Sequence, residues 1–555
     1  MNILFIARHF TYFRNYESVI VSLAERGHRV HLAAEKEEEL GGRDMVERLA
    51  AAHSVISLGW IPERDDRWAT IAARLRMAID YLRYRDAAYD EMPKLRARAR
   101  ERTPRLALWL AAAAGLGGSA GRWMLTAALR TIERALPRCP RINAYLQEQN
   151  PDVVLLTPLI GLVSSPQVDY LESAKALGYP TALCVWSWDH LSSKAIVRNV
   201  PDRIFVWNET QRDEAVRLHG IAADRVVVTG AQCFDQWFDR RPSLSREAFC
   251  RKVRLADDRP FLLYVCSALF RGSASEARFV QEWIRALRAS GLAPLASTPI
   301  LVRPHPARMK EWSEVDLGTE RDVAFWGRNP LDADARADYF DSLHHSAAVV
   351  GLNTSAFLEG AIAGRSIFAT LLPEHHENQE GTIHFHYLLN VDGGLLHTAR
   401  TLDAHAEQLN TALREGQVES ARSRRFVQAF IRPRGVDVAA TPLMVESIES
   451  LARTPRRAAR PEPVAARLLR AGLAPIGAML SSPSAEPLMS SERERAIAAC
   501  DRALHGEREE SWRRKHAHEA EQQRQKAERV AVRQRQKAQA AAEWHRAKAA
   551  KKLTQ

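Results

Sequence analysis

Residues 349–370, with the sequence VVGLNTSAFLEGAIAGRSIFAT, indicate most directly how this chain folds. The apolar residues at the start of the stretch suit a buried parallel strand, which residues 351–353 would end. Thr354 or Ser355 can cap a helix. The small and apolar residues that follow fit a helix packed tightly on a sheet, with Gly364 as its stop. The stretch therefore predicts a strand, a turn and a helix of a doubly wound α/β domain.

The turn in this stretch is a candidate phosphate site. Backbone N–H groups at a helix start point out of the carboxyl edge of a parallel sheet, where the helix dipole favours an anion. Asn353, Thr354 and Ser355 would contact that phosphate. Glu359, one turn inside the helix, could accept hydrogen bonds from ribose hydroxyls. Every doubly wound domain has such turns, so this turn alone leaves its function open.

A second turn, RPHP at residues 303–306, ends another predicted strand. Arg303 could pair bidentately with a phosphate, and His305 could donate a hydrogen bond to one. The alternative is a stiff turn with a solvent-exposed histidine. Because the two turns follow strands of one predicted sheet, the phosphate role is favoured.

Strand and helix patterns alternate over most of the chain. Residues 2–7 form the first predicted strand, and further strands follow in PDVVLLTPL, TALCVWSW, VPDRIFVWNE and DRVVVTGAQCFD. A second alternation begins at PFLLYVCSALF, after a polar connector. Such alternation predicts parallel sheets. We therefore expect two doubly wound, Rossmann-like domains, residues 1–240 and 241–452, that face each other across a cleft.

The first domain offers two candidates for a catalytic base. Its opening turn has Arg8, His9 and Phe10 in place of a GxGxxG pattern, so no dinucleotide cofactor is expected. His9 would lie at the carboxyl end of the first strand, and Asp189 would follow a later strand of the same sheet. Either side chain could take a proton from an acceptor hydroxyl. The alternatives are a structural turn histidine and, beside Asp189, tryptophans that belong to the core.

Residues 68–149 interrupt the alternation with an arginine-rich helical insertion that begins RWATIAARLRMAIDYLRYRDAAY. Helices of this composition can lie on an anionic bilayer, with apolar stems and aromatic rings at the interface. They can equally form a solvated amphipathic cover on the first domain. Both interpretations stay open.

The composition of the chain limits its partners and its compartment. A net charge of +12 without any nucleic-acid-binding signature favours an anionic substrate or membrane surface and excludes nucleic acid. The longest apolar run, residues 106–118, is shorter than the about 20 residues that a membrane span needs, and the apolar N-terminus is expected to be a strand. Six cysteines without CxxC spacing predict a reduced, cytoplasmic setting.

The end of the chain has a different composition. Residues 453–490 are rich in Pro, Arg and Ser and are expected to form a linker. Residues 491–555 are rich in Ala, Gln, Lys and Arg and lack an a/d stripe of large apolar residues. This second stretch is expected to be a basic tail, either a solvated helix or disordered.

The sequence EHHEN at residues 374–378 resembles a metal cluster only superficially. Its two histidines are adjacent and the segment has no HExxH spacing, so no metal site is expected. His376, Glu377 and Asn378 are expected instead in a loop that touches the donor sugar.

The RPHP turn, followed by the stretch at residues 349–370, resembles bacterial surface-polysaccharide transferases of the GT-B fold. It is most similar to the group that includes CDP-glycerol glycerophosphotransferases and capsule glycosyltransferases. The resemblance implies that His305, Thr354 and Ser355 hold the donor's phosphates and that Glu359 is a weaker candidate for its ribose. It covers about residues 1–450 at the level of the fold, while the insertion and the tail have no counterpart.

The predicted function is that of a glycosyltransferase. It would move a sugar or a related phosphoalcohol from a nucleotide-activated donor to a surface-polysaccharide or lipid-linked acceptor, without a cofactor. The expected location is the cytoplasm, at the inner face of the membrane if the insertion contacts lipid. A non-hydrolysing nucleotide-sugar 2-epimerase and a non-catalytic polysaccharide-binding or assembly scaffold are the alternatives.

Overall fold

The computed structural model describes residues 1–37, 41–113, 118–162, 165–330, 332–416, 420–480 and 482–500. Contacts divide the chain into two units, Met1–Met489 and Ser490–Gln555. In the second unit, Ser491 and Glu494 form a reciprocal capping pair, because the Ser491 N–H donates to Glu494 Oε2 (2.6 Å) and the Glu494 N–H to Ser491 Oγ (3.2 Å). The basic tail predicted beyond residue 500 lies outside the described residues.

The first unit contains a parallel sheet of seven strands in the order β3-β2-β1-β4-β5-β6-β7. Its strands are β1 (Asn2–Ala7), β2 (Arg29–Ala34), β3 (Ile56–Trp60), β4 (Val153–Thr157), β5 (Thr181–Cys184), β6 (Arg203–Val206) and β7 (Val226–Val228). Its flanking helices are η1 (Phe10–Tyr16), α1 (Glu17–Glu25), α2 (Gly42–Ala52), α8 (Gln167–Ala176), α9 (His190–Ser193), α10 (Glu209–His219), η3 (Ala223–Arg225), η4 (Gln232–Phe234) and α11 (Asp235–Asp239). The central strands are buried on both faces, which explains their nearly continuous apolar sequences.

The same unit contains a second parallel sheet of six strands in the order β10-β9-β8-β11-β12-β13. Its strands are β8 (Leu262–Val265), β9 (Ile300–Arg303), β10 (Val323–Phe325), β11 (Ala348–Gly351), β12 (Ser366–Thr370) and β13 (Leu396–Ala399). Its flanking helices are α12 (Arg246–Val253), α13 (Glu276–Ala289), η5 (Leu295–Ser297), η6 (Pro306–Glu314), α14 (Ala333–His345), α15 (Ala356–Ile362), η7 (Pro373–Asn378), α16 (Ile383–Asn390), η8 (Val391–Gly393), α17 (Leu402–Glu415) and α18 (Ala421–Phe430).

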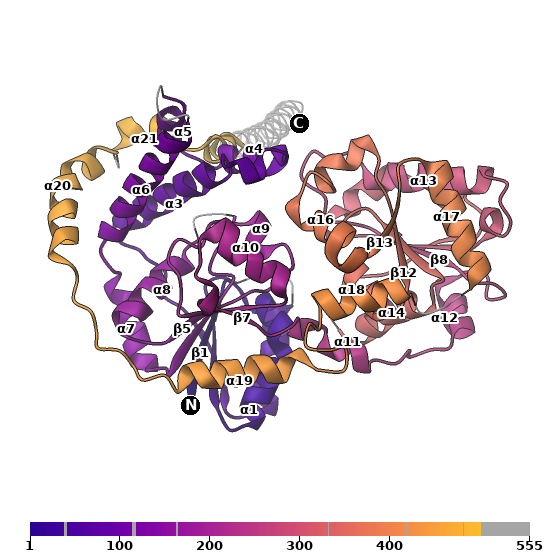
Figure 1. Ribbon diagram of the computed structural model, residues 1–555, viewed down its shortest axis with the longest axis horizontal. Coiled ribbons are helices and arrows are strands. Elements are labelled where there is room, and N and C mark those ends of the chain that lie inside the picture. The colour runs from indigo at the N-terminus through magenta and orange to yellow at the C-terminus, as the bar shows by residue number, and fades with distance from the viewer. Residues whose placement is uncertain are drawn as a thin grey trace, which may run out of the picture. The chain divides into compact units, whose positions relative to one another are not determined.

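Both sheets are doubly wound, as the sequence predicts. Strand order reverses between β1 and β4 in the first sheet and between β8 and β11 in the second, and every paired strand is parallel to its neighbour. In such sheets, ligands bind beside the carboxyl ends of the strands where the order reverses. The predicted fold class, two Rossmann-like domains with a helical insertion, is confirmed (Figure 1).

The insertion between β3 and β4 consists of helices and carries no strand among its described residues. It comprises α3 (Trp68–Arg83), η2 (Ala87–Tyr89), α4 (Pro93–Glu101), α5 (Arg105–Ala112), α6 (Ser119–Ala135) and α7 (Pro140–Gln149). Helix α4 also reaches the second domain, where Leu95 belongs to a cluster that Phe270 and Ile383 join.

After α18 the chain returns to the first domain. Helix α19 (Ala440–Ala452) packs beside α1, and its Thr441 hydroxyl lies 2.8 Å from that of Ser18. The sequence predicts a linker over residues 453–490, whereas the structure has α20 (Val464–Leu480), η9 (Pro483–Ala485) and α21 (Glu486–Met489) there. Apolar residues packed against α6 account for this difference.

In the described part of the chain, no single helix has both the length and the apolar character to cross a membrane. Val464–Leu480 and Pro483–Met489 meet these criteria only as a pair, with a bend of 73° between them.

Candidate active site

A buried network of hydrogen bonds supports the turn after β11. The Asn353 N–H donates to Ser267 Oγ (3.1 Å), and Ser267, which follows β8, donates through its own N–H to Glu276 Oε2 (2.7 Å). Glu276 is the first residue of α13 and is 2% exposed. Its burial raises the pKa of its carboxyl to about 8. This network fixes the turn at the point where the order of the second sheet reverses.

Thr354 and Ser355 begin helix α15 as the sequence predicts. Thr354 Oγ1 accepts a hydrogen bond from the Ala356 N–H (3.3 Å), while the Ser355 side chain is exposed and caps no backbone group. The helix is only seven residues long, and Gly364 follows it with φ +74°. Its short length limits its dipole, so an anion there would depend on individual N–H and hydroxyl groups.

Glu359 lies on the same helix in a tight polar contact. The Tyr339 hydroxyl donates to Glu359 Oε2. Burial raises the pKa of Glu359 to about 7, although Tyr339, Arg14 and Arg240 oppose the rise. One carboxylate oxygen is thus already engaged, which leaves the other for the ribose contact that the sequence predicts.

The two polar residues of the RPHP turn, Arg303 and His305, have different surroundings in the structure. Arg303 is 4% exposed, lies 3.5 Å from Asp338 Oδ2 and stacks 5.1 Å from the ring centroid of Tyr339. These contacts favour a structural role over phosphate binding. His305 is half-buried, and its Nδ1 accepts a hydrogen bond from the Ala307 N–H (3.2 Å), so Nε2 is the nitrogen that could meet a ligand.

The residues of the η7 loop have differing surroundings. Asn378 is 4% exposed, and its Oδ1 accepts a hydrogen bond from the Phe270 N–H (2.8 Å). Glu377 Oε2 lies 3.0 Å from Lys94 Nζ of the insertion. His376 is exposed. Asn378 and Glu377 therefore tie this loop to its neighbours, and His376 remains the member that is open to solvent.

His9 follows β1 and begins η1 in an extended conformation. Its ring centroid lies 4.7 Å from that of Tyr12, which in turn lies 5.1 Å from the ring of Trp186. Burial raises the pKa of Tyr12, and the carboxylates of Glu35 and Asp189 add to the rise. Both candidate bases of the first domain therefore lie near Tyr12.

Asp189 is engaged by several donors. Lys194 Nζ lies 2.7 Å from Asp189 Oδ2, Ser193 Oγ donates to the same oxygen (2.8 Å), and Ser187 Oγ donates to Oδ1. Burial alone would raise the pKa of Asp189, but Lys194 and these hydrogen bonds hold it well below the usual range. A carboxylate stabilised in this way is a weak base.

Two further residues that the sequence does not reveal lie near this region. His384 on α16 has its Nε2 3.4 Å from Asn353 Nδ2, and its ring centroid lies 4.8 Å from that of Trp188. Burial lowers the pKa of His384 to about 4, so its imidazole is neutral at physiological pH. Glu35, which follows β2, has a pKa raised to about 7 by burial. Neither His384 nor Glu35 belongs to a recognisable motif. The position of Glu35 at the end of a strand is the one sequence signal that could have identified it.

His384 connects the two domains at this point. It contacts Asn353 of the predicted donor turn and Trp188, the residue before Asp189. Next to it, the Tyr387 hydroxyl donates to Glu214 Oε1 of α10 (2.7 Å). The carboxyl edges of the two sheets therefore meet around α9 and α16. Among the described residues, no group of three or more His, Cys, Asp or Glu side chains could hold a metal ion.

No protein-family model matches the chain, and no curated protein matches it. A number of solved structures are similar to it, among them a glycosyltransferase, an epimerase and a UDP-bound protein. A glycosyltransferase from Rickettsia africae is 10% identical, with 82% of this chain and 99% of that chain covered and a TM-score of 0.46. The UDP-GlcNAc 2-epimerase from Neisseria meningitidis bound to UDP-GlcNAc is 11% identical, with 81% and 100% covered and a TM-score of 0.44. An Arabidopsis thaliana protein complexed with UDP is 9% identical, with 81% and 100% covered and a TM-score of 0.45. At these scores, the likeness assigns neither an activity nor a substrate to this chain.

Proposed function

We propose that the chain is a GT-B transferase that moves a sugar or a related phosphoalcohol from a nucleotide-activated donor to a surface-polysaccharide or lipid-linked acceptor. The observation that carries this proposal is the pair of contacts that His384 makes, with Asn353 of the predicted donor turn and with Trp188, which precedes Asp189 in the other domain. These contacts link a turn suited to phosphate to the region of Asp189. Such a meeting of the carboxyl edges of two parallel sheets is typical of a substrate site.

On the donor side, the nucleotide's phosphates would bind the turn formed by Asn353, Thr354 and Ser355. The exposed Ser355 hydroxyl and His305 Nε2 can donate to phosphate oxygens, and the Ser267–Glu276 network keeps the turn rigid. The similarity to the CDP-glycerol group is the reason to include a phosphoalcohol among the transferred groups. Hydrogen bonds from these donors would stabilise the negative charge of the leaving phosphate without a metal ion.

On the acceptor side, His9 is the favoured base. It would take the proton of the acceptor hydroxyl, whose oxygen then attacks the transferred group while the bond to the departing nucleotide breaks. Asp189 is the weaker candidate because Lys194 and two serines stabilise its charge. We assign it the task of holding Lys194 and the start of α9. Glu35 is a second candidate base, with a pKa of about 7 that suits proton transfer at neutral pH.

The proposed setting is the cytoplasmic face of an anionic membrane. The arginine-rich composition of the insertion, with Arg100 of α4 among its exposed residues, supports this part of the proposal. Attraction to anionic headgroups would bring the enzyme to a lipid-linked acceptor.

The donor site can be tested by calorimetry with UDP, CDP, GDP and ADP on the full chain. We expect one of these nucleotides to bind, and His305→Ala and Ser355→Ala each to weaken its binding about tenfold, because each removes one hydrogen bond to a charged group. Ser297→Ala is the matched control, since this exposed serine lies at the opposite edge of the same sheet.

Binding that is unchanged in both variants would rule out the donor assignment, and binding of no nucleotide at all would favour the scaffold. Incubation with UDP-N-acetylglucosamine in the absence of an acceptor separates the remaining alternative. An epimerase interconverts that sugar nucleotide, whereas a transferase leaves the sugar unchanged.

A further inference from the structure

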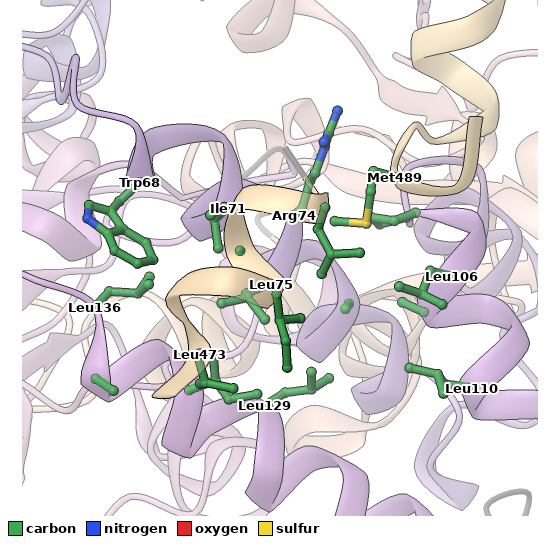
Figure 2. Close-up of a pocket in the computed structure, with 18 of the residues that line it drawn as sticks. Trp68, Ile71, Arg74, Leu75, Leu106, Leu110, Leu129, Leu136, Leu473 and Met489 are labelled. Carbon is green, nitrogen blue, oxygen red and sulfur yellow. The ribbon is translucent and has the colours of Figure 1, made fainter. Parts of the chain in front are cut away.

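An apolar cavity of about 240 Å³ lies between the insertion and helix α20 (Figure 2). Helices α3, α5, α6 and α20 supply most of its lining, and Met489 of α21 completes it. Leu75, Leu110, Leu129 and Leu473 are typical of the side chains that face it. Arg74 and Arg470 are the only charged residues among its lining residues. The cavity is larger than the about 150 Å³ that holds benzene in an engineered protein core.

The two arginines at this cavity are already paired with carboxylates. Arg74 Nη2 lies 2.9 Å from Glu486 Oε2, and both Arg467 and Arg470 contact Glu462. Neither arginine therefore makes the interior polar. A cavity with such a lining stays dry and accepts apolar ligands.

The helices around the cavity also expose large apolar side chains to solvent. Trp109 on α5 is 68% exposed, Trp123 on α6 is 72% exposed, and Leu468 on α20 is 69% exposed. Met124 and Met479 lie on the same helices and are exposed as well. Tryptophan and aliphatic side chains grouped on amphipathic helices are characteristic of surfaces that enter the headgroup region of a bilayer.

The charge on these helices is almost entirely positive. Helices α5, α6 and α20 carry six arginines and a single acid, Glu133, which pairs with Arg76 of α3. On the side of α6 away from the apolar cavity, Arg122, Arg130 and Arg134 line a second, polar cavity of about 610 Å³. Arg130 is half-buried, and Glu133 and Asp80 interact with it electrostatically. The excess of positive charge on these helices favours an anionic partner.

We infer that the cavity between α3, α5, α6 and α20 binds one hydrocarbon chain of an anionic membrane lipid. The apolar lining takes the chain, the exposed tryptophans enter the interface, and the net positive charge of α5, α6 and α20 attracts the anionic headgroup. This inference deepens the acceptor side of the proposed function by naming where a lipid's apolar part is held. It does not require that the donor site be correct.

Gly477 gives a direct way to fill the cavity. A Cβ at this position would lie 3.7 Å from Ile71 Cδ1 and 3.9 Å from Trp68 Cζ3, which is ordinary contact, so Gly477→Leu extends into the cavity without a backbone clash. Gly472→Leu on the same helix is the matched control, because no atom lies within 4 Å of its Cβ and it does not line the cavity. Both substitutions raise helix propensity equally.

The probe is cis-parinaric acid, an anionic fatty acid whose fluorescence rises in an apolar site, titrated against the full chain. We expect saturable binding of one equivalent that dodecyl phosphate displaces better than the uncharged dodecyl maltoside. Gly477→Leu should weaken this binding at least tenfold, and Gly472→Leu should leave it within twofold. Ala107→Leu fills the same cavity from α5 and should reproduce the loss.

The inference is overturned if the wild-type chain shows no saturable binding, or if both filling variants bind as tightly as the control. Sedimentation of the same proteins tests whether a second copy of the chain occupies the cavity instead. A wild-type dimer that Gly477→Leu converts to a monomer would assign the cavity to that second copy and overturn the inference. Nucleotide calorimetry on Gly477→Leu keeps the tests separate, since a lost lipid site with intact nucleotide binding leaves the proposed function standing.

Discussion

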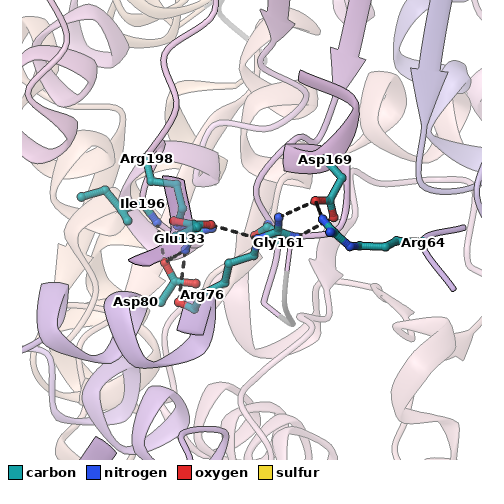
Figure 3. A network of polar contacts seen from close by, with 9 residues as sticks. Arg64, Arg76, Asp80, Glu133, Gly161, Asp169, Ile196 and Arg198 are labelled. Carbon is teal, nitrogen blue, oxygen red and sulfur yellow. Dashed lines mark hydrogen bonds and ion pairs between the residues drawn. The ribbon is translucent and has the colours of Figure 1, made fainter. Parts of the chain in front are cut away.

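Two contact regions in the first unit differ in the partners of their buried carboxyl groups. One joins the insertion to the first sheet, and the other joins the two domains. Where the insertion meets the first sheet, Arg76 of α3 donates two hydrogen bonds of 2.9 Å to Asp169 of α8 and a third, of 3.0 Å, to Glu133 of α6 (Figure 3). Arg64 reaches the same Asp169 at 2.8 Å. Burial alone would raise the pKa of Asp169, but the two arginines hold it below its usual range. This joint stays charged throughout the physiological range of pH.

Where the two domains meet, two buried carboxyl groups, Glu214 and Glu359, have no arginine partner at hydrogen-bond distance in the described part of the chain, although Asp235 there pairs with Arg432 at 2.8 Å. Glu214 is fully buried, and the Tyr387 hydroxyl donates to its Oε1 (2.7 Å). Burial raises the pKa of Glu214 to about 7. Glu359, with Tyr339 as its donor, behaves in the same way. The insertion is thus held by a permanently ionised network, whereas at Glu214 and Glu359 the contact between the domains is expected to respond to pH.

The largest effect is expected from Arg76→Ala. The substitution leaves Asp169 and Glu133 buried with one cation fewer, and breaking one partner of a buried ion pair costs about 3 to 5 kcal/mol. Chemical denaturation would measure the loss in the free energy of unfolding. Arg100→Ala, at an exposed position of α4, is the control and should change this free energy by less than about 0.5 kcal/mol.

A loss of less than about 1 kcal/mol in Arg76→Ala would contradict the picture of a permanent ionic joint. It would mean that apolar packing between α3 and α6 holds the insertion in place without the network.

The arginines of this network also show which features the sequence does not predict, namely which members of an arginine-rich helix are buried. Alternating apolar strands and helix stops predicted both sheets, because burial on two faces requires continuous apolar runs. The arginine-rich segment predicted helices, yet Arg76 and Arg83 are buried while Arg100 is exposed, and no local pattern separates them. Partners about a hundred residues away decide which arginines are buried: Asp169 for Arg76, and backbone carbonyl oxygens of residues 191–195 for Arg83.

The candidate site also has one part that local sequence signals predict and another part that only the tertiary fold brings together. The turn at Asn353 and Thr354 was predictable, because strand, cap and helix stop are local signals. His384, the residue that links this turn to the other domain, lies in an apolar helix whose sequence contains no motif. The structural role of Arg303 also depends on Asp338 and Tyr339, which only the tertiary fold brings beside it.

A smaller effect is expected from Glu214→Gln, and it concerns pH. The carboxyl's pKa is raised from an ordinary value near 4.5 to about 7, so the folded chain keeps a proton that the unfolded chain has lost. Its contribution is present below about pH 4.5 and disappears as pH rises through about 7, a loss of up to about 3 kcal/mol. Thermal unfolding from pH 5 to 8 should show stability falling in the wild type and falling less in the variant.

Glu209→Gln, at the exposed start of the same helix, is the control and should keep the wild-type slope. If Glu214→Gln also keeps the wild-type dependence of stability on pH, Glu214 does not retain its proton at the contact between the domains. This contact would then not differ from the ionised network at Asp169 in its response to pH.

The smallest effect is expected from Lys94→Ala, which tests a third kind of contact. Lys94 Nζ lies 3.0 Å from Glu377 Oε2 where the insertion reaches the second domain, but both side chains are substantially exposed, at 28% and 46%. Solvent and salt screen such a pair, so its loss should cost less than about 1 kcal/mol and less still at high salt. The neighbouring apolar cluster around Leu95 and Phe270 would hold this contact instead. A loss above about 2 kcal/mol at high salt, measured by denaturation, would show that an exposed pair can serve here as the buried network does at Asp169.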